Sequence, residues 1–197
     1  MNEQIIRELA NIVGEANIAT DTIDQITHSY DATQKKFLPD VVVYASTTEE
    51  ISRIVKVANT WKIPLLPRGA GSGFSGGSVP VKGGIVLVLT KMDRILKIDS
   101  ENLVAHVEPG VITAELQRQV EKRGLFYPPD PASKEFSTLG GNVAECAGGP
   151  RCVKYGVTKD YILGLEVVTP TGEVIKTGGE TLKNVVGYDL TKLFVGS

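Results

Sequence analysis

The glycine-rich stretch "PRGAGSGFSGG", at Pro67–Gly77, constrains the fold of this chain more than any other segment. Read from Gly71, it matches the G-x-G-x-x-G fingerprint of Rossmann dinucleotide sites. Asp93 lies 20 residues beyond Gly73, near the position of the acidic residue that binds ribose in those sites. In a Rossmann site a helix begins at the last glycine, and its N-terminus holds the pyrophosphate. Such a site therefore requires a helix directly after this loop.

The sequence after the loop opposes a helix. It reads "GSVPVKGGIVLVLT", in which Pro80, Gly83 and Gly84 interrupt helical spacing before a strand-like apolar run. The segment "TKMDRI" around Asp93 is typical of a turn between strands, so its spacing from the loop is accidental. Two interpretations remain. Either the glycines turn backbone N–H groups inward around an anion, or the stretch is a plain glycine-rich turn.

The remaining patterns predict an α+β fold. Helices are predicted over Glu3–Val13, after a capping box formed by Ser46 and Glu49, and from Thr113 to a cap at Gly124. Strands are predicted at Val41–Ala45, Ile63–Leu66, Ile85–Thr90, Ile95–Asp99, Leu103–Glu108, Ile162–Thr169 and Glu173–Lys176. The first two strands flank a helix and should run parallel, whereas the next three have no helix between them and indicate antiparallel or mixed pairing. The last two read as a hairpin that follows a Pro/Gly-rich middle segment.

Composition argues against several classes of protein. The chain has 197 residues, 42% of them hydrophobic and 22% charged, with a formal net charge of −2, so neither disorder nor nucleic-acid binding is implied. The longest apolar run, Gly84–Leu89, is too short to span a bilayer, and the N-terminus lacks a signal-peptide pattern. Cys146 and Cys152 have no histidine nearby and suit packed, reduced thiols. A cytoplasmic protein without a transmembrane segment is expected.

A second glycine-rich segment, "PPDPASKEFSTLGGNVAECAGGPRCVKYG", combines small polar side chains with glycines. Its hydroxyl and amide groups can donate hydrogen bonds, and its glycines would let a flat ring approach the backbone closely. The residues concerned are Ser137, Thr138, Gly140, Gly141, Asn142, Gly148 and Gly149. Together with the first loop, this segment favours a ligand that has both a pyrophosphate and a flat ring.

Several stretches, in order from about Pro39 to the C-terminus, carry a resemblance to a known family. They are "PLLPRGAGSGFSGGSVP", "VEPGV", "EFSTLGGNVAECAGGPRCVKYG" with "ILGLEVVTPTGEV", and "GYDLTKLFVGS". The chain resembles the FAD-binding domain of the vanillyl-alcohol oxidase (PCMH) type flavoproteins, within the branch that contains D-lactate dehydrogenase, D-2-hydroxyglutarate dehydrogenase and the flavin subunit of glycolate oxidase. The resemblance implies an α+β fold made of two α/β subdomains with FAD between them. This domain would occupy residues 39–197, after a helical lead-in at residues 1–38.

The resemblance also implies which residues bind FAD. Pro67–Gly73 would wrap the pyrophosphate, and the second segment would approach the flavin and its ribityl chain. The implied cofactor-binding residues are Pro67, Arg68, Gly69, Ala70, Gly71, Ser72, Gly73, Gly76, Pro131, Ser137, Thr138, Gly140, Gly141, Asn142, Glu145, Ala147, Gly148 and Gly149. Relatives with covalently attached flavin carry a histidine where this chain has Ser72, so non-covalent FAD is expected. A valine in place of Gly71 should then weaken FAD binding far more than folding.

The function implied by the resemblance is oxidation of a D-2-hydroxy acid, with hydride passing from the substrate α-carbon to flavin N5. A small 2-hydroxy acid and an iron–sulfur electron-transfer subunit are the implied partners, and the latter would bring the protein to the periphery of the inner membrane. The chain is expected to be incomplete, because the family continues beyond Gly196–Ser197 with E-G-T-L-G and a substrate domain. Neither His28 nor His106 is expected to be catalytic, and no metal site is expected.

Two alternatives stay open from the sequence. A reductase or oxidase of other substrates, such as an enolpyruvyl sugar reductase or an aldonolactone oxidase, would use the same fold. The chain would otherwise be a non-catalytic flavin-binding fragment, or a split subunit that needs a partner chain for activity.

Overall fold

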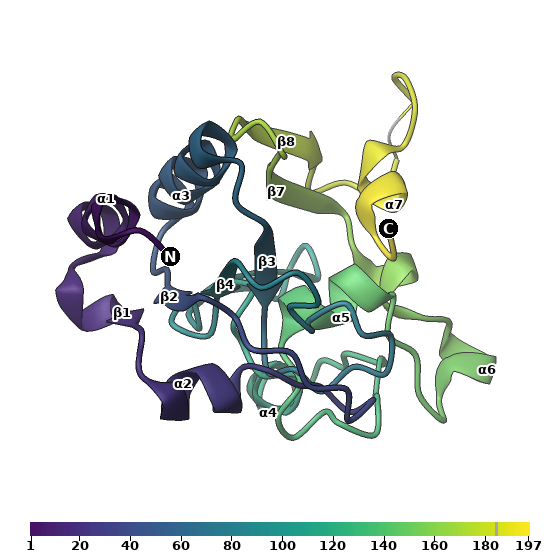
Figure 1. Cartoon of the computed structure of the whole chain (residues 1–197). Helices are drawn as coiled ribbons and strands as arrows, with labels where there is room; N and C mark the ends of the chain where they lie inside the picture. The colour runs from purple at the N-terminus through teal and green to yellow at the C-terminus, as the bar shows by residue number, and fades with distance from the viewer. Residues whose placement is uncertain (184) are drawn as a thin grey trace. The chain divides into compact units, whose positions relative to one another are not determined.

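The structure of the chain is a computed structural model that describes residues 1–183 and 185–197 (Figure 1). It contains two compact units. Unit 1 comprises Met1–Met92 and Val168–Val174, and unit 2 comprises Asp93–Val167 and Ile175–Ser197. Each unit combines helices with strands, which confirms the predicted α+β fold. Among the described residues, no helix has the length and apolar character needed to cross a lipid bilayer.

Unit 1 is built on a four-stranded sheet with the order β1-β2-β4-β3. The strands are β1 (Ile18–Ala19), β2 (Val41–Tyr44), β3 (Leu65–Arg68) and β4 (Ile85–Val88). β2 and β3 both pair in parallel with β4, whereas β1 runs antiparallel to β2. The predicted parallel arrangement of β2 and β3 is confirmed. Antiparallel or mixed pairing was predicted for the three strands between residues 85 and 108. The first of them, β4, instead pairs in parallel with β2 and β3 and is buried in the middle of this sheet.

Two long helices pack against this sheet. α1 (Glu3–Val13) and α3 (Thr48–Trp61) lie side by side, and the short helices η1 (Glu15–Asn17) and α2 (Thr22–Thr27) follow α1 (Figure 1). The core that they share with the sheet contains Ile5, Leu9, Val13, Val41, Val43, Ala45, Ile54, Ala58, Ile85 and Leu87. The predicted first helix is thus confirmed over its full length. The boundary proposed after residue 38 stays a prediction, although α1 contributes to the core of unit 1.

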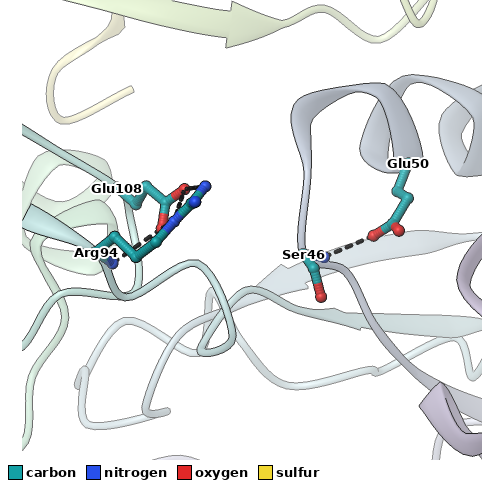
Figure 2. A network of polar contacts seen from close by, with 4 residues as sticks. All are labelled: Ser46, Glu50, Arg94 and Glu108. Carbon is teal, nitrogen blue, oxygen red and sulfur yellow. Dashed lines mark hydrogen bonds and ion pairs between the residues drawn. The ribbon is translucent and has the colours of Figure 1, made fainter. Parts of the chain in front are cut away.

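The N-terminus of α3 is capped one residue later than predicted. Thr47 is the N-cap, and its hydroxyl accepts a hydrogen bond from the Glu50 backbone N–H at 3.1 Å. The Glu50 carboxylate in turn accepts from the Ser46 backbone N–H at 2.7 Å (Figure 2). The predicted box of Ser46 and Glu49 is therefore wrong by one position. Ser and Thr are both good N-caps, and the sequence "STTEE" offers several such pairs.

In unit 2, an antiparallel hairpin packs against a helix. The hairpin strands are β5 (Ile95–Asp99) and β6 (Val104–Val107), and the helix is α4 (Thr113–Glu121). After α4, the Leu125 N–H bonds to the Val120 carbonyl at 3.0 Å and the Gly124 N–H bonds to the Glu121 carbonyl at 2.9 Å. With Gly124 at φ +72°, this is the Schellman arrangement, which confirms Gly124 as the terminating glycine.

Two further helices of unit 2 lie in the Pro/Gly-rich segment where none was predicted. These are α5 (Leu139–Glu145) and α6 (Cys152–Tyr155), followed by η2 (Thr158–Tyr161). α5 contains two glycines, which are poor helix formers, so propensity gave no indication of it. The predicted hairpin is confirmed as β7 (Gly164–Val168) and β8 (Val174–Gly178), and α7 (Leu190–Phe194) follows.

A buried carboxylate stabilises the start of unit 2. Glu108, in the "VEPGV" stretch, is 8% exposed and accepts hydrogen bonds from the Arg94 backbone N–H at 2.9 Å and from Arg94 Nη2 at 2.7 Å (Figure 2). These bonds from Arg94 hold the pKa of Glu108 below its ordinary value. The pair therefore stabilises the fold at pH values above the pKa that Glu108 has in the unfolded chain. This stability is lost as the pH falls through the lower pKa that Glu108 has in the folded chain.

Glu108→Gln is expected to lower the free energy of unfolding by about 1–3 kcal/mol at about pH 7, because a charge-assisted pair becomes a neutral one. The difference between the two proteins should narrow at about pH 3, where the unfolded carboxyl is protonated. Urea unfolding of both proteins at the two pH values measures this. A gap of the same size at both values would contradict the electrostatic explanation.

Candidate functional site

The first candidate segment lies at the carboxyl end of the parallel strands of unit 1. β2, β3 and β4 all run in the same direction and end at Tyr44, Arg68 and Val88. Pro67 and Arg68 are the last residues of β3, and the glycine loop, which we define as Gly69–Gly77, follows directly. Ligands of open α/β sheets bind outside the carboxyl ends of the strands. The loop is therefore in a favourable position for a ligand.

The conformation of the glycine loop agrees with an anion-binding function. Gly71 has φ +67° and Gly76 has φ +78°, values that L-amino acids with side chains rarely adopt. No helix follows the loop, as predicted, and the next regular element is β4. Within residues 1–183 and 185–197, the backbone N–H groups of Gly69–Gly73 have no hydrogen-bond acceptor. A run of such donors is suited to bind phosphate oxygens.

A buried arginine lies directly beneath the loop. Arg68 is 6% exposed, and its guanidinium donates from Nη1 to the Ser78 carbonyl at 3.0 Å and from Nη2 to the Tyr30 carbonyl at 2.7 Å. Burial lowers the pKa of Arg68, and the negative charge of nearby Asp31 opposes that shift. Arginine stays protonated in proteins. The loop therefore has a fixed positive charge next to its free N–H groups, which favours the binding of an anion there.

Gly71 has a structural role that the sequence did not reveal. A Cβ atom at Gly71 would lie 2.1 Å from Arg68 Nη2 and 2.5 Å from Arg68 Cζ. Arg68 is buried and bonded on two sides, so it has no room to move away. The expectation that valine here would affect binding far more than folding is therefore revised, because both depend on this contact.

The second candidate segment lies in unit 2, around α5. Thr138 is the N-cap of α5, and its hydroxyl accepts from the Gly141 N–H at 3.3 Å. A buried polar cluster holds the start of the helix: Thr113 Oγ1 accepts from Asn142 Nδ2 at 2.6 Å and lies 3.1 Å from Ser137 Oγ. The small polar side chains predicted as ligand donors are thus bonded inside unit 2: Ser137 and Asn142 bond to Thr113, and Thr138 bonds to the backbone of α5.

Two glycines of the second segment are required by the packing of the chain itself. A Cβ atom at Gly140 would lie 2.7 Å from Pro109 Cβ, and one at Gly149 would lie 2.2 Å from the Asp130 carbonyl oxygen. At Gly148 the nearest atom would be 3.5 Å away, in ordinary contact. Among the described residues, the N–H groups of Gly148 and Gly149 have no acceptor, so both remain available to a ligand.

The other predicted site residues occupy the edges of these two segments. Glu145 is the last residue of α5 and is exposed. The Ala147 carbonyl accepts from Thr158 N at 3.0 Å and from Thr158 Oγ1 at 2.7 Å, and the Pro131 carbonyl accepts from Lys134 N at 2.9 Å. The predicted residues 67–76 thus belong to unit 1 and the predicted residues 131–149 to unit 2.

Sequence reasoning missed the residues that support both segments from a distance. Tyr30 and Asp31 contact or face Arg68 in unit 1, and Thr113 and Asp130 hold the second segment in unit 2. The only local signal was the turn-forming sequence "DAT", which predicts a bend but no distant partner.

The histidines and cysteines take part in local contacts. His106 Nε2 lies 3.2 Å from Glu180 Oε1, and His28 Nε2 lies 3.5 Å from the Tyr44 hydroxyl oxygen. Cys146 and Cys152 are free, half-buried thiols. In the part of the chain that the structure describes, no three His, Cys, Asp or Glu side chains come together as a metal site.

Comparison with known proteins identifies the family. The profile of the FAD binding domain matches residues 39–178. The chain is 48% identical to glycolate oxidase subunit GlcD of Bacillus subtilis (strain 168), over 100% of this chain and 42% of the relative. It is 44% identical to D-lactate dehydrogenase of Anaerostipes hadrus, over 98% of this chain and 41% of the relative. The chain thus spans about two fifths of the length of these relatives.

The fold comparison agrees with this result. A solved structure of alkyldihydroxyacetonephosphate synthase superposes with a TM-score of 0.85 at 29% identity, over 100% of this chain and 38% of that chain. The matched region contains the glycine loop, with its free N–H groups, and the segment around α5. On this evidence the chain belongs to the FAD binding domain family, and it is similar in sequence to glycolate oxidase subunit GlcD and to D-lactate dehydrogenase.

Proposed function

We propose that this chain is the FAD-binding part of a flavin-dependent dehydrogenase or oxidase that acts on D-2-hydroxy acids of the glycolate or D-lactate type. The observation that carries the proposal is the glycine loop, where the N–H groups of Gly69–Gly73 lie free next to the buried charge of Arg68. The names of the relatives, glycolate oxidase and D-lactate dehydrogenase, supply the substrate class.

The donors present fit the chemical groups of FAD. A diphosphate needs several N–H donors and a positive charge, which the glycine loop and Arg68 offer in unit 1. A flavin ring needs an accessible backbone without bulky side chains. Gly148 offers this in unit 2, because it has no side chain and its N–H is free, and even an added Cβ atom would lie 3.5 Å from its nearest neighbour. The predicted cofactor-binding residues around α5 remain part of this proposal, with Asn142 and Ser137 in a supporting position.

The residues of this chain would bind and orient the cofactor. When bound, FAD supplies the two-electron redox chemistry that oxidation of a hydroxy acid requires. The loop N–H groups would hold the diphosphate, and the packed start of α5 would keep the segment that follows it rigid. Precise positioning of reacting groups is worth about 7–11 kcal/mol in enzymes, so a rigid cofactor site is itself a catalytic contribution.

Partner subunits form a second part of the proposal. The relative from Bacillus subtilis is named as a subunit of glycolate oxidase, which implies companion chains for that protein. We propose an iron–sulfur electron-transfer subunit as the companion here, and through it a peripheral position at the inner membrane. Purification of the tagged protein from its own cells, with iron and acid-labile sulfide measured in the product, tests this.

Non-covalent binding of FAD is expected, because the chain has Ser72 where relatives with covalently attached flavin carry a histidine. Acid precipitation of the FAD-loaded chain should release all of the yellow cofactor into the supernatant. Chromatography of the supernatant should then identify it as FAD. Flavin that stays in the protein pellet after washing would contradict this prediction.

The substrate class is tested with the full-length protein. Under anaerobic conditions, glycolate, D-lactate or D-2-hydroxyglutarate should bleach the visible absorbance of the bound flavin, whereas L-lactate should not. Bleaching by none of the D-2-hydroxy acids, in a protein that has bound FAD, would overturn the substrate assignment. It would leave a reductase of other substrates or a non-catalytic flavin protein as the explanation.

A further inference from the structure

A loop outside the region matched by the FAD-binding profile is closed by its own hydrogen bonds. We call it the Ser29–Phe37 loop; it precedes the matched residues 39–178. The Phe37 N–H donates to the Ser29 carbonyl at 3.0 Å, and Tyr30 pairs with Lys36 as an antiparallel bridge. Ser29 and Asp31 are buried, with 2% and 4% of their surfaces exposed. This segment is therefore a packed part of unit 1.

The tip of the Ser29–Phe37 loop bonds to the Arg68 side chain, just before the glycine loop, and to the Gly73 backbone within the loop. The Tyr30 carbonyl accepts from Arg68 Nη2 at 2.7 Å, at the end of β3. The Ala32 N–H donates to the Gly73 carbonyl at 3.2 Å. One bond holds the Arg68 side chain, and the other holds the last residue of the stretch whose N–H groups are free. Neither bond uses a donor of that stretch.

Asp31 lies between the two residues that make these contacts and sets the shape of the tip. Its Oδ1 atom accepts from the Thr33 N–H at 2.8 Å and also from the Thr33 hydroxyl. The Asp31 carbonyl accepts from the Gln34 N–H at 3.1 Å. Aspartate side chains that bond to the backbone two residues later stabilise tight turns. The orientation of the Tyr30 carbonyl and the Ala32 N–H therefore depends on this carboxylate.

We propose that Asp31 is a positioning residue for diphosphate binding, acting through the Ser29–Phe37 loop to hold Arg68 and the glycine loop in the conformation that accepts the anion. The inference rests on the proposed function, because it presumes that the glycine loop binds the diphosphate of FAD. Glycine-rich backbone loses much conformational freedom when it is ordered. A loop that is ordered in advance binds its ligand without that loss, and so binds more tightly.

The test compares two substitutions of the same carboxylate in the 197-residue chain. Asp31→Ala removes the acceptor for Thr33, and the affinity for FAD and for ADP should fall by about tenfold, as expected from one lost organising contact. Asp31→Asn keeps an oxygen acceptor in the same place and should restore binding to within about threefold of the unaltered chain. Because asparagine keeps the oxygen acceptor but not the negative charge, this rescue would show that Asp31 acts through the shape of the turn and not through its charge.

A matched control and a reserve variant keep the test decisive. Asp99→Ala removes a similar turn carboxylate in unit 2, where Asp99 accepts from the Asn102 N–H at 3.0 Å, and it should leave ADP affinity unchanged. If Asp31→Ala fails to fold, Thr33→Val serves instead, since it removes the hydroxyl that donates to Asp31 and keeps the backbone N–H that also donates to it. The hydroxyl also accepts from the Lys35 N–H, at the longer distance of 3.5 Å. The loss of affinity should then be about threefold.

Amide NMR provides a second readout that does not require the cofactor. Without FAD, Asp31→Ala should shift the amide signals of Gly71 and Gly73, while the signal of Gly124 in unit 2 stays unchanged. Unaltered ADP affinity together with unaltered Gly71 and Gly73 signals would overturn the inference. If the unaltered chain itself binds neither FAD nor ADP, the proposed function fails, and the binding role of Asp31 fails with it.

Discussion

Gly71→Val is expected to lower both the free energy of unfolding of the chain and its affinity for FAD. The loss of stability should be about 2–5 kcal/mol, the sum of a left-handed backbone conformation imposed on a side chain and of overpacking. The overpacking arises because the new Cβ atom would lie 2.1 Å from Nη2 of buried Arg68. FAD affinity falls as well, since the displaced loop no longer presents its N–H groups together.

Gly76→Val is the matched control for this prediction. Gly76 also has a positive φ, of +78°, but a Cβ atom there would meet nothing within 4 Å. It should therefore cost only the backbone strain, about 1–2 kcal/mol. Urea unfolding of the two variants, with FAD titration of each, isolates the contact with Arg68. Equal losses of stability at the two positions would show that this contact contributes nothing.

Gly149→Ala is expected to destabilise unit 2 by about 2–5 kcal/mol, from backbone strain and from collision. Its φ is +147°, and the added Cβ atom would lie 2.2 Å from the Asp130 carbonyl oxygen, which belongs to the backbone and cannot rotate away. Gly148→Ala, one residue earlier, would meet its nearest atom at 3.5 Å. That change should cost less than about 1 kcal/mol of stability and should instead weaken FAD binding.

Measurement of both variants distinguishes a glycine that is required for folding, Gly149, from a glycine that is required for FAD binding, Gly148. Thermal melting without FAD should rank Gly149→Ala far below Gly148→Ala, whereas FAD titration should find Gly148→Ala weaker than the unaltered chain. A Gly148→Ala protein with unaltered affinity for FAD would remove Gly148 from the proposed binding residues.

The parts of this fold that the sequence predicted are those specified by local patterns. Apolar spacing predicts α1 over its full length, and Pro80 with the glycines after it correctly predicts that no helix follows the glycine loop. The place of β4 was not predictable in this way. Its apolar residues indicate that it is buried on both faces. The identity of its neighbours β2 and β3, however, depends on contacts that are distant in sequence.

The candidate site follows the same division. The sequence predicts where glycine is needed, yet the reason for each glycine lies in a distant partner: Arg68 for Gly71, Pro109 for Gly140 and Asp130 for Gly149. α5 was not predicted, because its two glycines disfavour a helix. The buried hydrogen bond between Asn142 and Thr113 compensates for this low helix propensity. The contacts by which Asp31 and Tyr30 support Arg68 and the glycine loop could not be predicted from the sequence either. A short polar turn does not indicate which distant residue it will contact.

We propose that this chain binds FAD through both its diphosphate and its flavin. Calorimetric titration of the 197-residue chain with FAD, FMN and NAD tests it most directly. FMN has the flavin without the diphosphate bridge, and NAD has the bridge without the flavin, so each lacks one of the two groups. FAD should bind at least about tenfold more tightly than either, as expected when each group contributes about 1.4 kcal/mol or more. Equal affinity for FMN, tighter binding of NAD, or no binding of FAD would contradict it.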